Sequence, residues 1–87
     1  MTDDAHEYEL IIAQRFVKDM RRLSREDQVR VRRALSRIQL EPCQGRKVVA
    51  AETGQYRWRV GSLRIRYDIE GRYIQILRVI KREEAYR

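Results

Sequence analysis

Four arginines occupy alternate positions on the two sides of a short turn in the stretch Tyr56–Tyr67 (YRWRVGSLRIRY). Arg57 and Arg59 precede the turn, and Arg64 and Arg66 follow it. Because the side chains of a β-strand alternate between its two faces, we expect all four arginines on one face of two adjacent strands. A planar guanidinium can donate paired hydrogen bonds to phosphate oxygens. The pattern therefore predicts a basic surface suited to a sugar-phosphate backbone.

A face kept basic only for solubility is the simpler alternative. Like charges directly opposite one another on adjacent strands repel each other by a few tenths to about 1 kcal/mol per pair. A mixture of Lys, Glu and Thr would keep an open face soluble without that repulsion. The arginine pattern therefore favours phosphate binding over solubility.

The composition of the whole chain also favours an anionic partner. The 87 residues carry a formal net charge of +7, and their number allows one domain, 1–87, with one small core. No apolar run approaches the roughly 18–20 residues that span a bilayer, and the acidic start MTDDAHEYE lacks the features of a signal peptide. We therefore expect a cytoplasmic protein with no membrane partner, for which nucleic acid is the commonest anionic partner.

The chain is poor in cysteine and histidine. Cys43 is the only cysteine and His6 the only histidine, so an internal disulfide is excluded and no recognisable zinc spacing can be assembled. A Ser-His-Asp or Cys-His catalytic set would have to use His6, near the start of the chain. We therefore expect neither a metal nor a cofactor.

The first half of the chain is predicted to form a strand and two helices. The strand is expected at Tyr8–Ala13, an apolar stretch too short for an independent helix. Gln14–Leu23 carries apolar residues at helical spacing, and Ser24 has the side chain and the position of a helix N-cap. The second helix is expected to run to about Leu40, because Pro42 favours extended backbone before it.

The second half is predicted to form three strands, at Tyr56–Val60, Leu63–Glu70 and Arg72–Ile80, after a loop at Glu41–Lys47. Only one or two residues separate the strands, so they must form an antiparallel meander. The expected fold class is α+β, in the order β-α-α-β-β-β, with a helix hairpin packed on one face of an antiparallel sheet. The four arginines would then lie exposed on its open face.

These motifs together resemble the RelE/ParE superfamily of toxins from bacterial and archaeal toxin–antitoxin pairs. YELIIAQRFVKDMRRLSREDQVRVRRAL is similar to the family's first strand and helix hairpin. YRWRVGSLRIRYDI and ILRVIKREEAYR resemble its Tyr-Arg-x-Arg-Val-Gly, Arg-x-x-Tyr and terminal Arg-x-x-x-Tyr patterns. The resemblance covers nearly the whole chain and points to the RelE-like branch.

The resemblance implies a ribosome-dependent endoribonuclease that enters the vacant A site of the 70S ribosome and cuts the mRNA there. In such a reaction the ribose 2′-hydroxyl attacks the adjacent phosphorus, and charge develops on the phosphate and on the leaving 5′ oxygen. It also implies an acidic cognate antitoxin that wraps the toxin and neutralises it. Neither a metal nor a cofactor is part of this scheme.

The resemblance and the arginine pattern together give a set of candidate site residues. The expected RNA-binding residues are Arg57, Arg59 and Arg66, and the expected catalytic residues are Arg64, Lys81, Arg82 and Tyr86. Arg64 would bind the phosphate, and Arg82 would stabilise the leaving oxygen, since an arginine is a poor proton donor at neutral pH. Lys81, where many relatives have His, would supply the proton, and Tyr86 would stack on a base.

Two other functions remain open at this stage. ParE-like relatives share the fold but poison DNA gyrase by binding it, which would make the protein a non-enzymatic inhibitor. A basic open sheet can also bind RNA or DNA without any chemistry and only block its target. The three sheet arginines that match the RNA-cleaving branch, together with Arg82 and Tyr86, favour the endoribonuclease.

Overall fold

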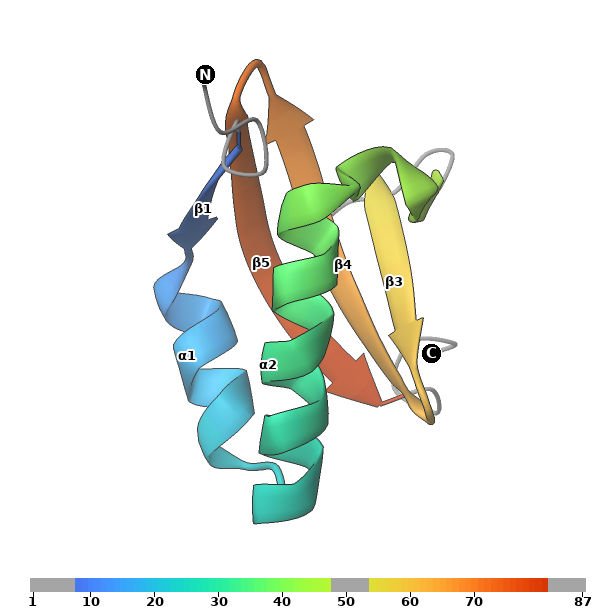
Figure 1. The fold of residues 1–87 in the computed structure, drawn as a ribbon. Coiled ribbons are helices and arrows are strands. Elements are labelled where there is room, and N and C mark those ends of the chain that lie inside the picture. Colours follow the sequence, from blue (N-terminus) through green and yellow to red (C-terminus); the bar gives the residue numbers. More distant parts are fainter. Residues whose placement is uncertain (1–7, 48–53, 82–87) are drawn as a thin grey trace, which may run out of the picture.

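The computed structural model describes residues 8–47 and 54–81, which form a layer of two helices over one face of a five-stranded sheet (Figure 1). In chain order the elements are β1 (Glu9–Ile12), α1 (Gln14–Arg21), α2 (Arg25–Leu40), the 3-10 turn η2 (Pro42–Gln44), β2 (Arg46–Lys47), β3 (Tyr56–Val60), β4 (Leu63–Glu70) and β5 (Tyr73–Lys81). Among the helices that the structure describes, none is long and apolar enough to cross a membrane. The expected α+β class is confirmed.

The sheet has the strand order β1-β5-β4-β3-β2 and is mixed rather than purely antiparallel. The predicted meander of β3, β4 and β5 is confirmed, but β1 pairs parallel to β5, with Leu10 opposite Ile74. This parallel pairing is possible because the two helices carry the chain away from β1 before it returns to the sheet. The short strand β2 was not predicted, because two residues are too few to show an alternating pattern.

The helix hairpin begins and ends close to the predicted positions. Ser24 is the N-cap of α2, and its Oγ accepts a hydrogen bond of 3.1 Å from the backbone N–H of Asp27. The side chain of Gln28 donates to the carbonyl of Met20 at 2.8 Å and to that of Leu23 at 3.4 Å. The start of α2 therefore satisfies carbonyls that the end of α1 leaves without an intrahelical partner.

The core lies between the two layers and uses the apolar faces that the sequence predicted. Its buried members are Phe16, Val31, Ala34, Ile38, Leu63, Ile65, Tyr67, Ile74, Ile76 and Val79. Tyr56, Trp58 and Val60 of β3 are partly buried against this cluster. Because these three residues face the helices, the residues that alternate with them face the other way.

Asp19 of α1 is a buried carboxylate. It is 7% exposed and accepts bonds from Arg78, through Nε at 2.7 Å and Nη2 at 3.1 Å, and from the N–H of Val79 at 3.1 Å. β1 ends at Ile12, and α1 follows along β5 (Figure 1). Asp19 therefore satisfies a backbone donor on the part of β5 that β1 does not reach.

Tyr67 joins the central strand β4 to the turn η2. Its hydroxyl donates a hydrogen bond of 2.6 Å to the carbonyl of Pro42, and its ring stacks on Tyr56 with centroids 5.4 Å apart. A side chain at Gly45 would collide with the Tyr67 hydroxyl, so glycine is required there for the turn to approach this closely. Tyr67 thereby fixes the turn that leads into β2.

Replacing Tyr67 by phenylalanine is expected to change how stability depends on pH. Burial raises the pKa of Tyr67 to about 12, whereas an unfolded tyrosine titrates near about 10. The raised pKa stabilises the folded protein fully below pH about 10, and this stabilisation of roughly 2–3 kcal/mol is lost as the pH approaches about 12. At neutral pH the variant should be less stable by about 1–2 kcal/mol, because the Pro42 carbonyl loses its donor.

Urea titrations of both proteins from neutral pH to about pH 12 measure this difference, since the other tyrosines and the lysines are common to both. The stability advantage of the natural protein should shrink to zero or reverse over the last two pH units of the series. Parallel pH profiles for the two proteins would contradict the assignment of the high pKa to Tyr67.

Candidate nucleic-acid interface

Arginines form two rows across the face of the sheet that the helices leave open. Arg46, Arg57 and Arg66 lie directly opposite one another on β2, β3 and β4. In the next row Arg59 lies opposite Arg64. Their neighbours along β3 and β4 pack toward the core, so these arginines leave the sheet on the opposite face. The prediction that the arginines share one face is confirmed.

Arg64 is buried, however, and the prediction that it lies exposed on the open face is wrong. It is 2% exposed, whereas Arg59 is exposed and Arg57 is half-buried. β4 lies between β3 and β5 in the sheet, and Arg64 lies opposite Arg59 on β3 and opposite Ile80 on β5. An anion that approaches this face therefore meets Arg57 and Arg59 before it can reach Arg64.

Arg66 has a structural contact in addition to its place in the row. Its Nη2 donates to the carbonyl of Gly54 at 2.8 Å, and the Asp68 carboxylate on the same strand accepts from the N–H of Gln55 at 2.6 Å. Gly54 has a φ of 74°, and a Cβ there would lie 2.9 Å from the backbone nitrogen of Tyr67. Arg66 and Asp68 thus hold the residues that lead into β3 against the sheet.

The pKa of Arg66 is lowered by burial and, to a smaller extent, by the neighbouring charge of Arg57, while Asp68 acts in the opposite direction. Burial and a nearby positive charge both disfavour the charged form of a guanidinium. A bound anion close to Arg66 would offset both effects at this residue.

Lys81 lies away from Arg64, although the sequence analysis placed both in one catalytic set. The register between β4 and β5 shifts by one residue: Tyr67 lies opposite Ile76 but Arg66 lies opposite Arg78. This bulge reverses the alternation in the last part of β5, so Lys81 pairs with Leu63 and leaves the sheet on the helix-covered face.

Lys81 is exposed and lines a groove between α1 and the end of β5. The residues of this groove are Arg15, Asp19, Arg22, Leu23, Arg78, Val79, Ile80 and Lys81. The other two predicted catalytic residues, Arg82 and Tyr86, lie outside the described residues. The structure therefore brings together Arg57, Arg59, Arg64 and Arg66 from the predicted set.

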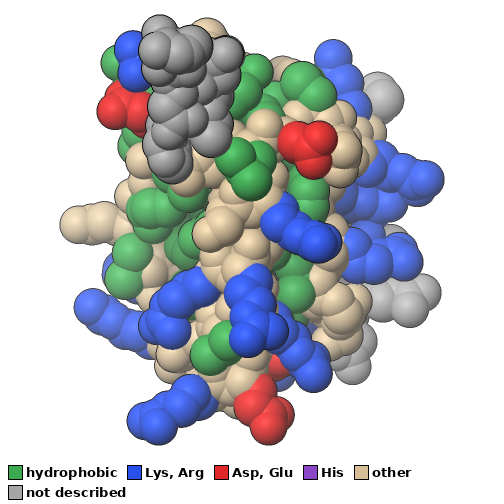
Figure 2. All heavy atoms as spheres, in the orientation of Figure 1, with side chains coloured by type: hydrophobic (Ala, Val, Ile, Leu, Met, Phe, Trp, Pro, Cys, Tyr) green, Lys and Arg blue, Asp and Glu red, His purple; other side chains and the backbone are tan. Residues whose placement is uncertain are grey.

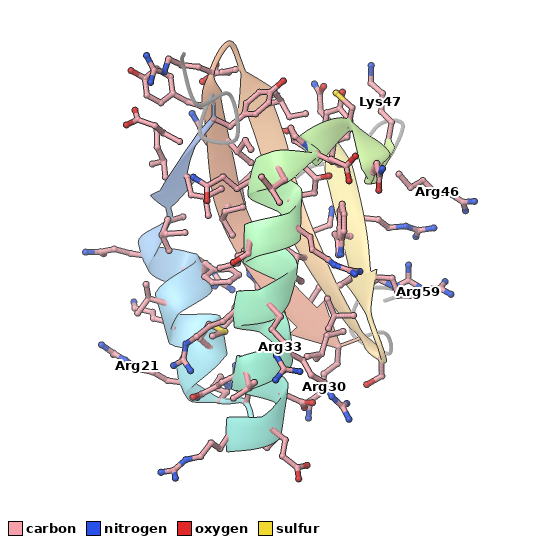
Figure 3. All side chains as sticks on the ribbon, viewed as in Figure 1. Arg21, Arg30, Arg33, Arg46, Lys47 and Arg59 are labelled. Carbon is pink, nitrogen blue, oxygen red and sulfur yellow. The ribbon has the colours of Figure 1, made fainter. Side chains whose placement is uncertain are left out.

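A second feature, missed by the sequence analysis, is a hollow at the edge formed by β2 and β3. It is lined by Gln44, Gly45, Arg46, Arg57, Trp58 and Arg59. Figure 3 shows Arg46 and Arg59 projecting from this edge, and Figure 2 shows basic side chains gathered along the same side of the molecule. The basic pair Arg46-Lys47 was a signal in the sequence, but its position beside β3 depends on the pairing of β2.

Metal ligands are scarce in the part of the chain that the structure describes. No group of three or more His, Cys, Asp or Glu side chains there is arranged to hold a metal ion. The donors that the open face offers to a ligand are guanidinium groups, which suit phosphate oxygens.

A small α+β domain with two helices over one face of a mixed sheet is the architecture of RelE-like toxins, as three solved structures show. The toxin–antitoxin complex RelBE2 of Mycobacterium tuberculosis matches with a TM-score of 0.77 at 24% identity, over 86% of this chain and 98% of that chain. The RelB–RelE complex of Methanococcus jannaschii matches with 0.70 at 26% identity, over 87% and 94% of the two chains. The RelE–RelB complex of Pyrococcus horikoshii OT3 matches with 0.73 at 23% identity, over 87% and 96%.

The sequence itself shows the family to which the chain belongs. Residues 10–86 match the model of the ParE toxin family, described as the ParE toxin of the type II toxin–antitoxin system parDE. The chain therefore belongs to this family and is a toxin of a type II toxin–antitoxin system, which confirms the predicted RelE/ParE superfamily. No curated protein matches the sequence.

Proposed function

We propose that this toxin is a ribosome-dependent endoribonuclease that acts in the cytoplasm on mRNA in the A site of the 70S ribosome. The observation that carries the proposal is the set of like-charged pairs in direct register: Arg46 with Arg57, Arg57 with Arg66, and Arg59 with Arg64. A further arginine, Arg78, lies opposite Arg66, but its charge is compensated by Asp19. Each pair destabilises the free protein by a few tenths to about 1 kcal/mol. A sugar-phosphate backbone laid across the sheet would neutralise all three pairs at once.

The arginine face supports a defined division of roles. Arg57 and Arg59 are accessible and would hold the phosphate that the neighbouring 2′-hydroxyl attacks. Arg64 lies directly behind them and would stabilise the charge that develops on that phosphate, because a cation in a buried site acts at a low effective dielectric. Direct contact between Arg64 and the phosphate would require the side chains around it to move.

The remaining roles follow from the family resemblance. Arg82 would stabilise the leaving 5′ oxygen, and Tyr86 would stack on a base and help to orient the 2′-hydroxyl. Lys81 is left out of the proton transfer, because it leaves the sheet on the face opposite Arg64. Water would accept the proton of the 2′-hydroxyl and would protonate the leaving 5′ oxygen. Arg66 would contribute positive potential while it holds the residues before β3.

The purified protein is expected to leave free RNA largely intact and to cut mRNA in programmed ribosomes. The described part of the open face carries arginines, and the two carboxylates that β4 places on it are already bonded, Asp68 to the N–H of Gln55 and Glu70 to the side chain of Gln75. A strong general base is therefore missing from this region, and the ribosome would have to position the 2′-hydroxyl and the phosphate. Primer extension on both substrates measures the difference, and rapid EDTA-resistant cutting of free RNA would contradict it.

Inhibition of DNA gyrase is the second candidate function, and the match to the ParE family model favours it. The two functions are separated by running primer extension on translated mRNA beside a gyrase supercoiling assay. The proposed function predicts codon-phased cuts and normal supercoiling. Inhibited supercoiling without cuts would make the toxin a gyrase inhibitor. If neither cuts nor inhibition is seen, the protein would be a non-catalytic binding module.

We also propose an acidic cognate antitoxin as the partner that silences this surface. The three solved structures described above are all complexes of a toxin with its antitoxin. A carboxylate-rich segment would compensate the arginine rows, and apolar contacts would hold the complex together.

A further inference from the structure

We propose that the hollow at the β2–β3 edge binds one nucleotide of single-stranded RNA, with the phosphate between Arg46 and Arg59 and the base against Trp58. This inference rests on the proposed function for its choice of RNA, and it adds a binding site beyond the arginine rows. The site would lead the RNA off the open face and around the edge of the sheet.

The hollow exists because β2 is much shorter than the strand beside it. β2 pairs only with Tyr56 and Arg57, so in the part of the chain that the structure describes no strand lies along the outer side of β3 from Trp58 to Val60. The chain turns away at Gly45, and this turn is fixed by the contact between Pro42 and Tyr67 described above. The walls of the hollow are therefore held by the core.

The side chains around the hollow match the parts of a nucleotide. Arg46 and Arg59 are exposed, project from the same edge in Figure 3, and line the hollow together with the half-buried Arg57. Guanidinium groups bind phosphate through paired hydrogen bonds. Trp58 packs partly against the core, and its intermediate exposure leaves part of the residue at the hollow. Aromatic rings beside a basic groove are the usual platform for the bases of single-stranded RNA.

An acidic peptide is the other polyanion that three arginines could attract. The aromatic ring distinguishes the two, because stacking contributes about 1–3 kcal/mol per base and a run of carboxylates offers no flat ring to stack. The position of the hollow also favours RNA, since Arg57 and Arg59 belong both to the hollow and to the rows on the open face. One RNA strand can therefore cross from one region to the other.

The chain has a single tryptophan, so its fluorescence reports on this site alone. The experiment titrates the purified full-length protein with a short oligouridylate, follows Trp58 emission, and measures total binding in parallel by anisotropy of labelled RNA. A saturable change in emission is expected at the same RNA concentrations as binding. Arg46→Gln should raise the Kd for the RNA about tenfold, because it removes one charged hydrogen-bonding partner.

The matched control is Arg21→Gln, which removes the same charge from α1, on the opposite side of the molecule from Arg46 (Figure 3). Its Kd should stay within about twofold of the natural protein, because at moderate salt distant surface charges are screened. Equal weakening by Arg46→Gln and Arg21→Gln would overturn the site in favour of a general charge effect. Binding by anisotropy with unchanged Trp58 emission would overturn it as well.

Two further polyanions test the chemistry of the ligand. Inorganic polyphosphate should compete with the RNA but leave Trp58 emission nearly unchanged. Polyglutamate at equal charge should neither compete with the RNA nor change the emission. The same saturable emission change with polyphosphate would overturn base stacking, and the same change with polyglutamate would make the hollow a peptide site.

The titration separates the inference from the proposed function because it contains no ribosome and no cleavage step. If RNA changes Trp58 emission as expected but the protein never cuts mRNA, the endoribonuclease function is refuted and the nucleotide site is retained. A chain that cuts mRNA in ribosomes without any Trp58 response to RNA would refute the nucleotide site alone.

Discussion

Replacing Arg57 and Arg59 together by glutamine is expected to lower mRNA cleavage in ribosomes by about a thousandfold. Removing one preorganised donor from a developing anion commonly lowers the rate by about a hundredfold to a thousandfold, and the effects of two donors on one phosphate do not add fully. Single-turnover cleavage of a programmed ribosome measures the rate of the chemical step. Glutamine keeps the first two methylene groups and a polar end group, so the sheet should be preserved.

The same double variant is expected to be more stable than the natural protein by about 0.5–1 kcal/mol, because it removes repulsion between directly opposed charges. Arg57 lies between Arg46 and Arg66 in one row, and Arg59 lies opposite Arg64 in the next. Urea titration at low salt measures this gain, which should shrink as salt screens the charges. A loss of activity together with a gain of stability would identify a surface whose charges serve binding.

The control is the double variant Lys18→Gln/Arg21→Gln, which removes two exposed charges from α1. Its cleavage rate should stay within about twofold of the natural rate, since neither side chain is on the sheet. Full cleavage by the Arg57 and Arg59 double variant, in a folded protein, would refute the phosphate-binding role of the open face.

Replacing Asp19 by asparagine is expected to destabilise the protein by about 3 kcal/mol. The carboxylate is buried, accepts two bonds from Arg78, and also satisfies the N–H of Val79. Removing the charge of the buried partner leaves the half-buried Arg78 without compensation, which is more destabilising than losing a surface pair. For a chain of 87 residues this is a large part of a total stability of about 5–10 kcal/mol.

Asp27→Asn is the matched control, because it makes the same change in an ion pair that is much more accessible to solvent. Asp27 lies 3.6 Å from Arg30, whose side chain is 61% exposed, and such a pair contributes about 0–1 kcal/mol. The free energies of unfolding of the two variants, measured by thermal or urea unfolding, should therefore differ by about 2 kcal/mol or more. Equal stabilities would show that α1 is held to β5 by its apolar contacts alone.

Local features of this protein could be predicted from the sequence. The start of α2 was predicted correctly because Ser24 and the backbone of Asp27 form the cap within one turn of chain. The antiparallel pairing of β3, β4 and β5 followed from connections of one or two residues, which allow no other arrangement. The shared face of Arg57, Arg59, Arg64 and Arg66 followed from the alternation along each strand.

Features that depend on distant parts of the chain could not be predicted in this way. Asp19 is buried because β1 is too short to cover all of β5, and the parallel pairing of these two strands joins residues far apart in sequence. Arg64 is buried because its strand is central in the sheet, which a pattern along one strand does not show.

The face of Lys81 was decided by a single bulge. Strict alternation from Ile74 and Ile76 would have placed Lys81 on the open face with Arg64, but the register shift opposite Arg66 and Tyr67 turns it toward α1. The hollow beside Trp58 likewise depends on where β2 stops. Side-chain alternation and helix capping depend on neighbouring residues, so they can be predicted along the chain. Register, bulges and strand order are set by packing between distant segments, and these three features placed the site residues relative to one another.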